Sequence, residues 1–145
     1  RHPNRQEYRL QDMRRRAAIA GLQINLKPAH WPTNGAPSGY AIIAAQNAGG
    51  GDMGKLVHSF GAACWADDRD ISQDDVIRDC LQGAGFDPAL ADSGLLTGAD
   101  TFASNLDEAV RRGVFGAPFF ITDQDERLWG QDRLDDLDAV LAGKV

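Results

Sequence analysis

The sequence is poor in the residue types that carry redox and metal chemistry. It contains two cysteines and three histidines among 145 residues. Cys64 and Cys80 are too far apart for a CxxC motif, and two cysteines are too few for a disulfide scaffold. His2, His30 and His58 share no metal-ligand spacing with either cysteine, so no zinc site is expected. Both cysteines lie in apolar helical patterns, which favours buried thiols in a reducing, cytoplasmic compartment; a regulatory thiol pair is the alternative.

Long apolar runs and an excess of positive charge are absent as well. No stretch approaches the ~20 apolar residues that cross a bilayer, and the first residues lack the pattern of a signal peptide. Acidic residues outnumber basic ones by 21 to 15, and the resulting net charge of −6 disfavours broad nucleic-acid binding. We therefore expect a soluble protein with neither a membrane nor a nucleic acid as its partner.

The composition is typical of a globular domain, and its apolar residues recur mostly at helical spacing. Hydrophobic residues make up 43% of the chain and charged residues 25%. After a loop over Arg1–Arg5, the pattern predicts a helix from about Gln6 to Gly21. An extended piece and a loop follow, where Pro28 and Pro32 exclude a helix. Four further helices are predicted over residues 39–48, 53–64, 76–84 and 89–96.

Polar residues are placed to cap three of these helices. Asp52 precedes the second of the four and is expected to accept from its free N–H groups. Ser72 and Asp75 have the spacing of a capping box for the third. Asp87 followed by Pro88 has the pattern of an N-cap and a first helical residue for the fourth.

The last third of the chain combines helices with two short strands. A helix over residues 100–112 is predicted to end at Gly113 and to turn one apolar face inward, formed by Phe102, Leu106, Ala109 and Val110. Two strands are predicted within residues 114–121 and over 127–129, and a final helix follows Gly130. A two-stranded sheet is marginal by itself, so it needs further strands that these residues do not supply.

Ala117–Pro118 is the first candidate binding feature. A proline that opens a strand cannot donate to the ladder, and an X–Pro bond is the kind that has an accessible cis form. A cis bond would present the N–H and C=O groups of Ala117 to an extended peptide ligand, as an added strand would. An ordinary structural turn is the alternative.

The second candidate is the turn from Trp129 to Asp132. Gly130 and Gln131 lie where a strand leads to a helix N-terminus, whose free N–H groups attract carboxylates. These groups suit the carboxylate of a zwitterionic amino-acid head, whereas Asp132 would take its ammonium group. An acidic residue that only stabilises the first turn of its helix is the alternative.

The segments GVFGAPFF and WGQDRLDDL together resemble the 2-hydroxychromene-2-carboxylate isomerase family, which is similar to the kappa-class glutathione transferases and to the DsbA branch of the thioredoxin fold. EYRLQDMRRRAA, HWPTN and CWADDRDIS are further matches, so the resemblance covers essentially the whole chain. It implies an α/β thioredoxin-like fold with a large all-helical insertion. In this chain it implies a mostly α structure, with the insertion at residues 1–98. Residues 99–145 would form the C-terminal half of the thioredoxin-like domain, a two-strand remnant with cis-Pro118.

The resemblance also implies a site for glutathione beside a pocket for an aromatic acid. Ala117 matches the residue that pairs with the glutathione backbone. Asn4 and Arg5 match a substrate-binding pair ahead of the first helix, where Arg5 would hold a pyruvate carboxylate. Trp31 matches a substrate-binding aromatic residue in a loop. The γ-glutamyl end would be held by the turn residues Trp129, Gly130, Gln131 and Asp132.

The implied activity is glutathione-dependent isomerisation of a 2-hydroxychromene-2-carboxylate-type acid to the trans-o-hydroxybenzylidenepyruvate type, a step of aromatic catabolism, in a homodimer. The family's thiolate-stabilising serine belongs to an N-terminal βαβ segment expected ahead of Arg1. No catalytic residue is therefore assigned within these residues, and we expect them alone to be inactive. The alternatives are a kappa-like glutathione transferase, a DsbA-like thiol oxidoreductase with CxxC in that segment, and a non-catalytic binding module.

Overall fold

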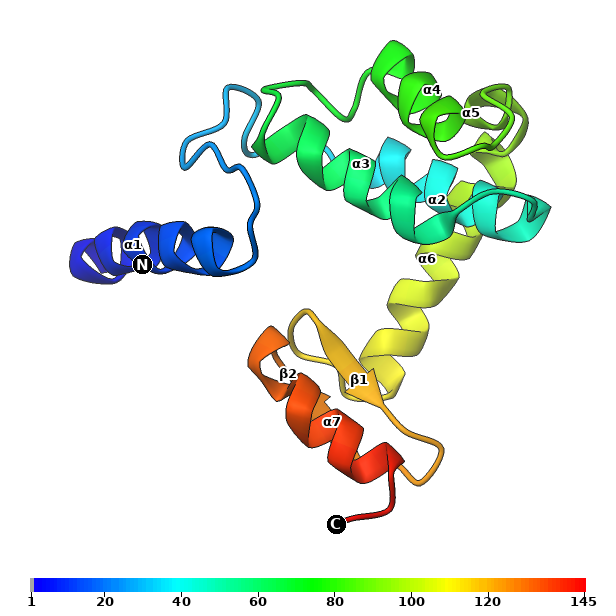
Figure 1. Ribbon diagram of the computed structural model, residues 1–145. Coiled ribbons are helices and arrows are strands. Elements are labelled where there is room, and N and C mark those ends of the chain that lie inside the picture. Colours follow the sequence, from blue (N-terminus) through cyan, green and yellow to red (C-terminus); the bar gives the residue numbers. More distant parts are fainter. Residues whose placement is uncertain (1) are drawn as a thin grey trace. The chain divides into compact units, whose positions relative to one another are not determined.

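The computed structural model describes residues 2–145, and the chain divides into two compact units, residues 1–103 and 104–145 (Figure 1). The division falls within one helix, α6 (Leu95–Arg111). Arg1, which the sequence assigns to a loop, lies outside the described residues. The predicted boundary between residues 98 and 99 separates a helical insertion from the C-terminal half of a thioredoxin-like domain. It is not tested by the division into compact units, and it stays a prediction.

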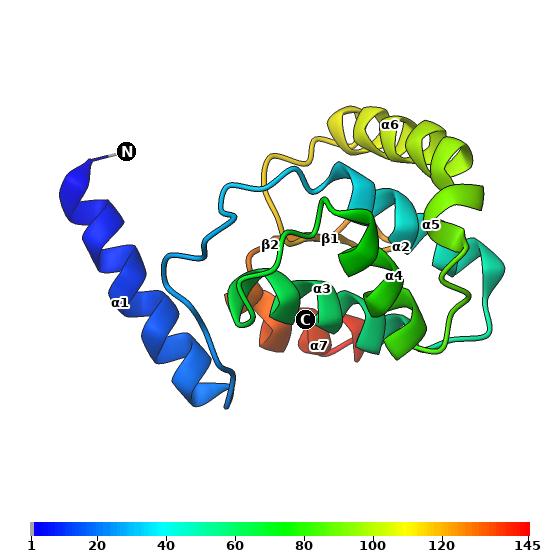
Figure 2. The ribbon, with the colours of Figure 1, turned by 90° about the horizontal axis from the view of Figure 1, so that it is seen from above.

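The first unit is helical and has its core where three helices pack together, as Figure 2 shows for α2, α3 and α4. Leu56 of α3 and Leu81 of α4 are fully buried there, and Phe86 closes the core from the loop after α4. The elements of this unit are α1 (Pro3–Ile19), α2 (Ala36–Ala48), α3 (Met53–Trp65), α4 (Asp74–Gly83), α5 (Leu90–Ser93) and the first part of α6.

Helix α1 begins earlier than its apolar pattern predicts. Pro3 occupies the first turn, and the His2 side chain caps it by accepting from the backbone N–H of Asn4 at 3.3 Å. Proline is favoured at this position because its fixed φ suits the helix and its missing N–H has no partner there in any case. The prediction that Asn4 and Arg5 lie in a loop ahead of the helix is therefore wrong. The predicted end at Gly21 is confirmed, since this glycine follows the helix with a φ of 66°.

One of the predicted caps forms as expected and two differ. Asp52 Oδ1 accepts from the backbone N–H of Lys55 at 2.9 Å at the start of α3. The predicted capping box ahead of α4 is wrong, because the hydroxyl of Ser72 donates instead to Asp70 Oδ1 at 2.7 Å. Asp87 Oδ1 accepts from the backbone N–H of Ala89 at 2.9 Å, although α5 itself starts one residue later.

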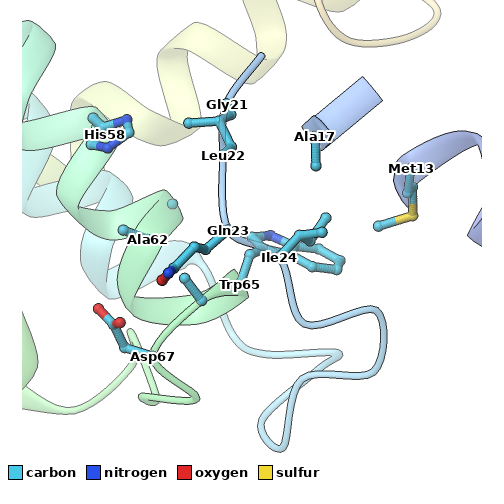
Figure 3. A pocket seen from close by; sticks show the side chains of 12 residues that line it. Met13, Ala17, Gly21, Leu22, Gln23, Ile24, His58, Ala62, Trp65 and Asp67 are labelled. Carbon is cyan, nitrogen blue, oxygen red and sulfur yellow. The ribbon is translucent and has the colours of Figure 1, made fainter. Parts of the chain in front are cut away.

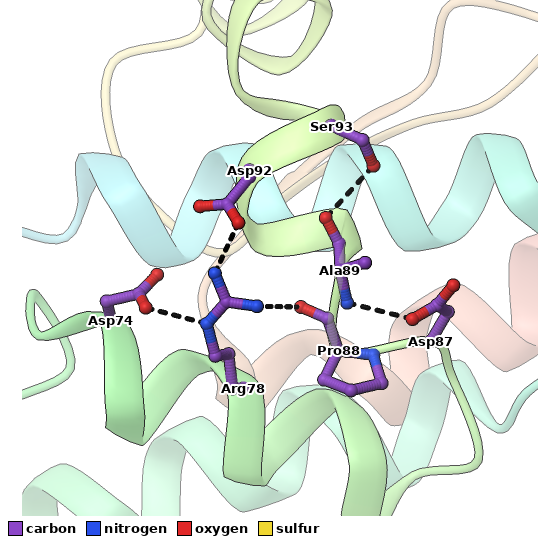
Figure 4. A network of polar contacts seen from close by, with 7 residues as sticks. All are labelled: Asp74, Arg78, Asp87, Pro88, Ala89, Asp92 and Ser93. Atoms are coloured by element: carbon purple, nitrogen blue, oxygen red, sulfur yellow. Dashed lines mark hydrogen bonds and ion pairs between the residues drawn. The ribbon is translucent and has the colours of Figure 1, made fainter.

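A single residue, Arg78, ties α4 to α5 and to the loop before it (Figure 4). Its Nε donates to Asp74 Oδ2 at 2.6 Å, its Nη1 to the carbonyl of Pro88 at 3.2 Å, and its Nη2 to the carboxylate of Asp92. The predicted helix over residues 89–96 is interrupted at Gly94, which separates α5 from α6. A side chain at this glycine would overlap the Cβ atom of Ala44 in α2, so the break permits close packing.

The second unit has the predicted pattern of a helix, two strands and a helix. Strands β1 (Phe119–Ile121) and β2 (Arg127–Trp129) are antiparallel, with Phe119 opposite Trp129 and Phe120 opposite Leu128. A 3₁₀ turn, η1 (Gln131–Arg133), leads into α7 (Leu134–Leu141). The structure is thus mostly helical with one two-stranded sheet among residues 2–145.

The predicted inward face of α6 is wrong for its second half. Leu106 is 61% exposed and Val110 is 68% exposed, because two short strands and one helix offer too little surface to cover them. Phe102 is half-exposed, yet its ring contacts Tyr40 of α2 edge-on at 5.4 Å between centroids. Within residues 2–145, every helix is either too short or too polar to cross a membrane.

Gly98→Ala tests the close approach of α6 to α2. A Cβ atom at this position would lie 2.7 Å from the carbonyl oxygen of Tyr40 and 3.0 Å from its Cα. Because backbone atoms cannot move aside locally, we expect the substitution to lower the free energy of unfolding by about 1–3 kcal/mol.

Gly83→Ala is the matched control. A Cβ atom at this position of α4 would contact nothing within 4 Å. The control should be neutral or stabilising by up to about 1 kcal/mol, as usual for alanine in place of a helical glycine. Urea denaturation of both variants gives the comparison, and equal effects would contradict the packing described here.

Candidate functional site

A backbone hydrogen bond joins the two candidate binding segments. The Gly130 N–H donates to the Pro118 carbonyl at 3.0 Å, next to the pairing of Phe119 with Trp129. The Ala117–Pro118 peptide bond is cis. Within residues 2–145, the N–H and C=O groups of Ala117 have no hydrogen-bond partner in the protein. The segment before β1 and the turn after β2 therefore lie side by side and form one candidate site, with free backbone groups at its edge.

Three aromatic rings form a partly exposed surface at this site. The Phe115 ring lies 5.0 Å from that of Phe119 and 5.1 Å from that of Trp129, both edge-on. Phe115 and Trp129 are exposed. A side chain at Gly116 would overlap the indole nitrogen of Trp129, so this glycine lets the indole lie against the main chain.

The turn after β2 depends on a glycine and presents a carboxylate. Gly130 has a φ of 117°, a conformation that is strained for any residue with a Cβ atom. A Cβ atom there would also lie 2.5 Å from Asp132 Oδ1, so the carboxylate lies over the glycine. The N–H groups of Gln131 and Asp132 make no hydrogen bond with any residue in the described part of the chain. Free N–H groups and one exposed carboxylate thus lie side by side.

The profile of the DSBA-like thioredoxin domain matches residues 2–142. The chain belongs to the DSBA-like thioredoxin domain family. This match confirms the fold family that the sequence motifs indicate, and it supports thiol-related or glutathione-related activity in general. No curated protein matches the sequence.

In this member of the DSBA-like thioredoxin domain family, the predicted substrate-binding residues lie in the first unit. Asn4 and Arg5 belong to the exposed first turn of α1. Trp31 lies in the loop between α1 and α2, is 52% exposed, and contacts Trp65 with 4.6 Å between ring centroids. Among the described residues, no hydrogen bond, ion pair or ring contact links Trp31 to the other two.

The first unit also contains a cavity that the sequence motifs do not indicate. It has a volume of about 580 Å³ and is bounded by α1, the segment after it and α3 (Figure 3). Its walls are largely apolar, and its polar lining residues are Gln23, His58 and Asp67. The sequence marks Trp65 only as part of the CWADDRDIS motif. Periodicity alone could not reveal the cavity, because α1 and α3 are distant in sequence.

The two cysteines of the chain are buried and form no disulfide, as expected. Burial raises the pKa of the Cys64 thiol, and Asp70 and Asp68 raise it further. Burial also raises the pKa of the Cys80 thiol. Because the thiolate is the reactive form, neither residue is suited to nucleophilic or redox chemistry at neutral pH. Within residues 2–145, no cluster of three His, Cys, Asp or Glu side chains is placed to hold a metal ion.

Alkylation measures the state of these thiols. We expect iodoacetamide at pH 7.5 to modify Cys64 and Cys80 at least about 100-fold more slowly in the native chain than in urea, since modification needs an opening of the core. Mass spectrometry of the quenched protein counts the modified residues. Rapid modification of either thiol in the native chain would contradict the burial described here.

Proposed function

We propose that this chain is part of a glutathione-dependent isomerase that acts on a 2-hydroxychromene-2-carboxylate-type acid and forms the trans-o-hydroxybenzylidenepyruvate type. The family match supports thiol- or glutathione-related activity in general. The finer assignment rests on the motifs and on the hydrogen bond between Gly130 and Pro118, which joins the segment around Ala117 to the turn from Trp129 to Asp132.

The residues present fit a tripeptide with a charged amino-acid end. Ala117 offers one free donor and one free acceptor to the ligand backbone, as an edge strand does. The free N–H groups of Gln131 and Asp132 suit the γ-glutamyl carboxylate, and the Asp132 carboxylate suits its ammonium group. Gly130 keeps this part of the site open, since any side chain there would collide with Asp132.

When bound, glutathione supplies a thiolate that adds reversibly to the conjugated acid, so that a former double bond becomes free to rotate. The role of this chain is to hold the tripeptide at Ala117 and at the turn from Trp129 to Asp132. Arg5, with its planar guanidinium, is assigned to the substrate carboxylate, and Trp31 to the aromatic ring. Asn4 is assigned to the polar groups of the same substrate. The protein is proposed to act as a homodimer in the cytoplasm.

A kappa-like glutathione transferase is the second candidate, because the same site would hold glutathione for other electrophiles. A DsbA-like thiol oxidoreductase uses a reactive thiol pair, and the buried thiols of Cys64 and Cys80 do not favour that function for these residues. A non-catalytic binding module is the remaining candidate. Glutathione binding measured by thermal shift separates it from the first two.

Asp132→Ala tests the γ-glutamyl turn. We expect it to weaken the binding of reduced glutathione about tenfold, because the ammonium group loses a charge-assisted hydrogen bond. Binding of the dipeptide Cys-Gly, which lacks the γ-glutamyl group, should not change.

The control is Asp135→Ala, which removes an exposed carboxylate from the first turn of α7. Isothermal titration calorimetry gives all the dissociation constants. If both variants weaken glutathione binding equally, the carboxylate of Asp132 acts only through general electrostatics and the assigned role is wrong.

Arg5→Gln tests the assigned carboxylate contact. We expect it to weaken the binding of trans-o-hydroxybenzylidenepyruvate about tenfold and to leave glutathione binding unchanged, since an interaction with the substrate carboxylate is lost. Arg9→Gln, one turn further along the exposed surface of α1, is the control and should leave the binding of both ligands unchanged. Unchanged substrate binding in Arg5→Gln would remove this residue from the site.

A further inference from the structure

The loop that carries Trp31 is tied down on both sides by two carboxylates of the α3–α4 connection. Asp68 Oδ2 accepts from Asn25 Nδ2 at 2.6 Å, and Asp68 Oδ1 accepts from the backbone N–H of Ala29 at 2.9 Å. On the far side of Trp31, Asp70 Oδ1 accepts from the hydroxyl of Thr33 at 3.0 Å. The loop over residues 25–33 thus has fixed points both before and after the indole.

Asp70 is itself held in one orientation. Its Oδ1 accepts from the backbone N–H of Ser72 at 3.0 Å and from the Ser72 hydroxyl at 2.7 Å, and its Oδ2 accepts from Gln73 Nε2 at 3.0 Å. These bonds hold the pKa of Asp70 well below its usual range, and the bond from the backbone N–H of Ser72 has the largest effect. The group is therefore a fixed acceptor at neutral pH, and it can anchor Thr33 without moving.

Asp68 maintains its two bonds from an unfavourable backbone conformation. Its φ is 54°, in the left-handed region that residues with a Cβ atom rarely occupy. Aspartate and asparagine tolerate this region better than most residues. Bonds to Asn25 and Ala29 from such a position indicate that the local backbone is adapted to reach the loop.

The loop anchored in this way places the Trp31 indole against that of Trp65, with the two ring planes tilted by 45°. Trp65 is the last residue of α3 and lines the cavity of the first unit. The backbone N–H of Asn25 also donates to the Trp65 carbonyl, at 2.5 Å, so the start of the loop is joined to the same residue. Trp31 remains 52% exposed, which leaves part of the indole available to a ligand.

We propose that Asp68 and Asp70 are positioning residues that hold Trp31 against Trp65 and so orient the aromatic surface offered to a planar acid. The proposal rests on the proposed function in one respect, namely that Trp31 contacts the substrate. Fixing the loop before binding removes the entropy cost of ordering it in the complex. A fixed indole also selects planar ligands by the angle at which they can stack.

The orientation of Trp31 has a direct optical readout. Two indoles in contact couple their electronic transitions and give a couplet in the far-ultraviolet circular-dichroism spectrum, which is obtained as the difference from Trp31→Phe. We expect this couplet to be lost in Asp70→Ala and in Asp68→Gly, where glycine removes the side chain without adding backbone strain. It should persist in Asp68→Asn, because asparagine accepts the same φ and its amide oxygen can receive the Ala29 N–H.

Asp75→Ala is the control, since it removes an exposed carboxylate from the first turn of α4. All spectra are recorded well below the melting temperature of each variant, and the indole N–H resonances of Trp31 and Trp65 provide a second measurement. Retention of the couplet in both Asp70→Ala and Asp68→Gly would overturn the proposal. Its loss in the Asp75→Ala control would also overturn it.

Ligand binding separates this proposal from the proposed function. We expect Trp31→Phe and Asp70→Ala each to weaken the binding of trans-o-hydroxybenzylidenepyruvate about three- to tenfold. This range corresponds to the free energy that one aromatic pair contributes. Glutathione binding should stay constant in both. If the couplet is lost while substrate binding is unchanged in all variants, the positioning role stands and the assigned contact between Trp31 and the substrate is wrong.

Discussion

The pairing of β1 with β2 is the constraint on which the candidate site depends. It places Phe119 opposite Trp129, and this register carries the Gly130 N–H to the Pro118 carbonyl. A shift of one residue would turn every side chain of a strand to the other face and would break that bond. The free backbone groups of Ala117 and the carboxylate of Asp132 belong to one site because of this pairing.

The two units differ in how far they bury their apolar side chains. In the first, α2, α3 and α4 enclose a core around Leu56 and Leu81, and close helix contacts are made at glycines such as Gly98. In the second, Leu128 is the buried apolar residue among those described, whereas Phe115 and Trp129 beside Ala117 stay exposed. The helical unit thus carries the Trp31 loop, whereas the strand pair carries the candidate binding groups of Ala117 and Asp132.

The sequence predicts most helices because their stability comes from local patterns. The apolar spacing of α3 and the Asp52 cap are properties of a few neighbouring residues, and both are confirmed. The predicted capping box at Ser72 fails, because the Ser72 hydroxyl donates to Asp70, a bond that the spacing of Ser72 and Asp75 does not indicate. The exposure of Leu106 could not be predicted either, because a helical stripe shows that a face is apolar without showing what covers it. The juxtaposition of Ala117 with the Trp129 turn followed from the motifs, but the two carboxylates that hold the Trp31 loop depend on partners about forty residues away.

The guanidinium of Arg78 has a consequence for how this protein can diverge. One planar side chain serves two carboxylates and a carbonyl from three successive parts of the chain. A lysine has no such fork, so it could replace one of these interactions but not the set. Substitution at Arg78 would leave the exposed carboxylates of Asp74 and Asp92 without the partner that they share. Substitutions at these three positions are therefore expected to be correlated in related sequences.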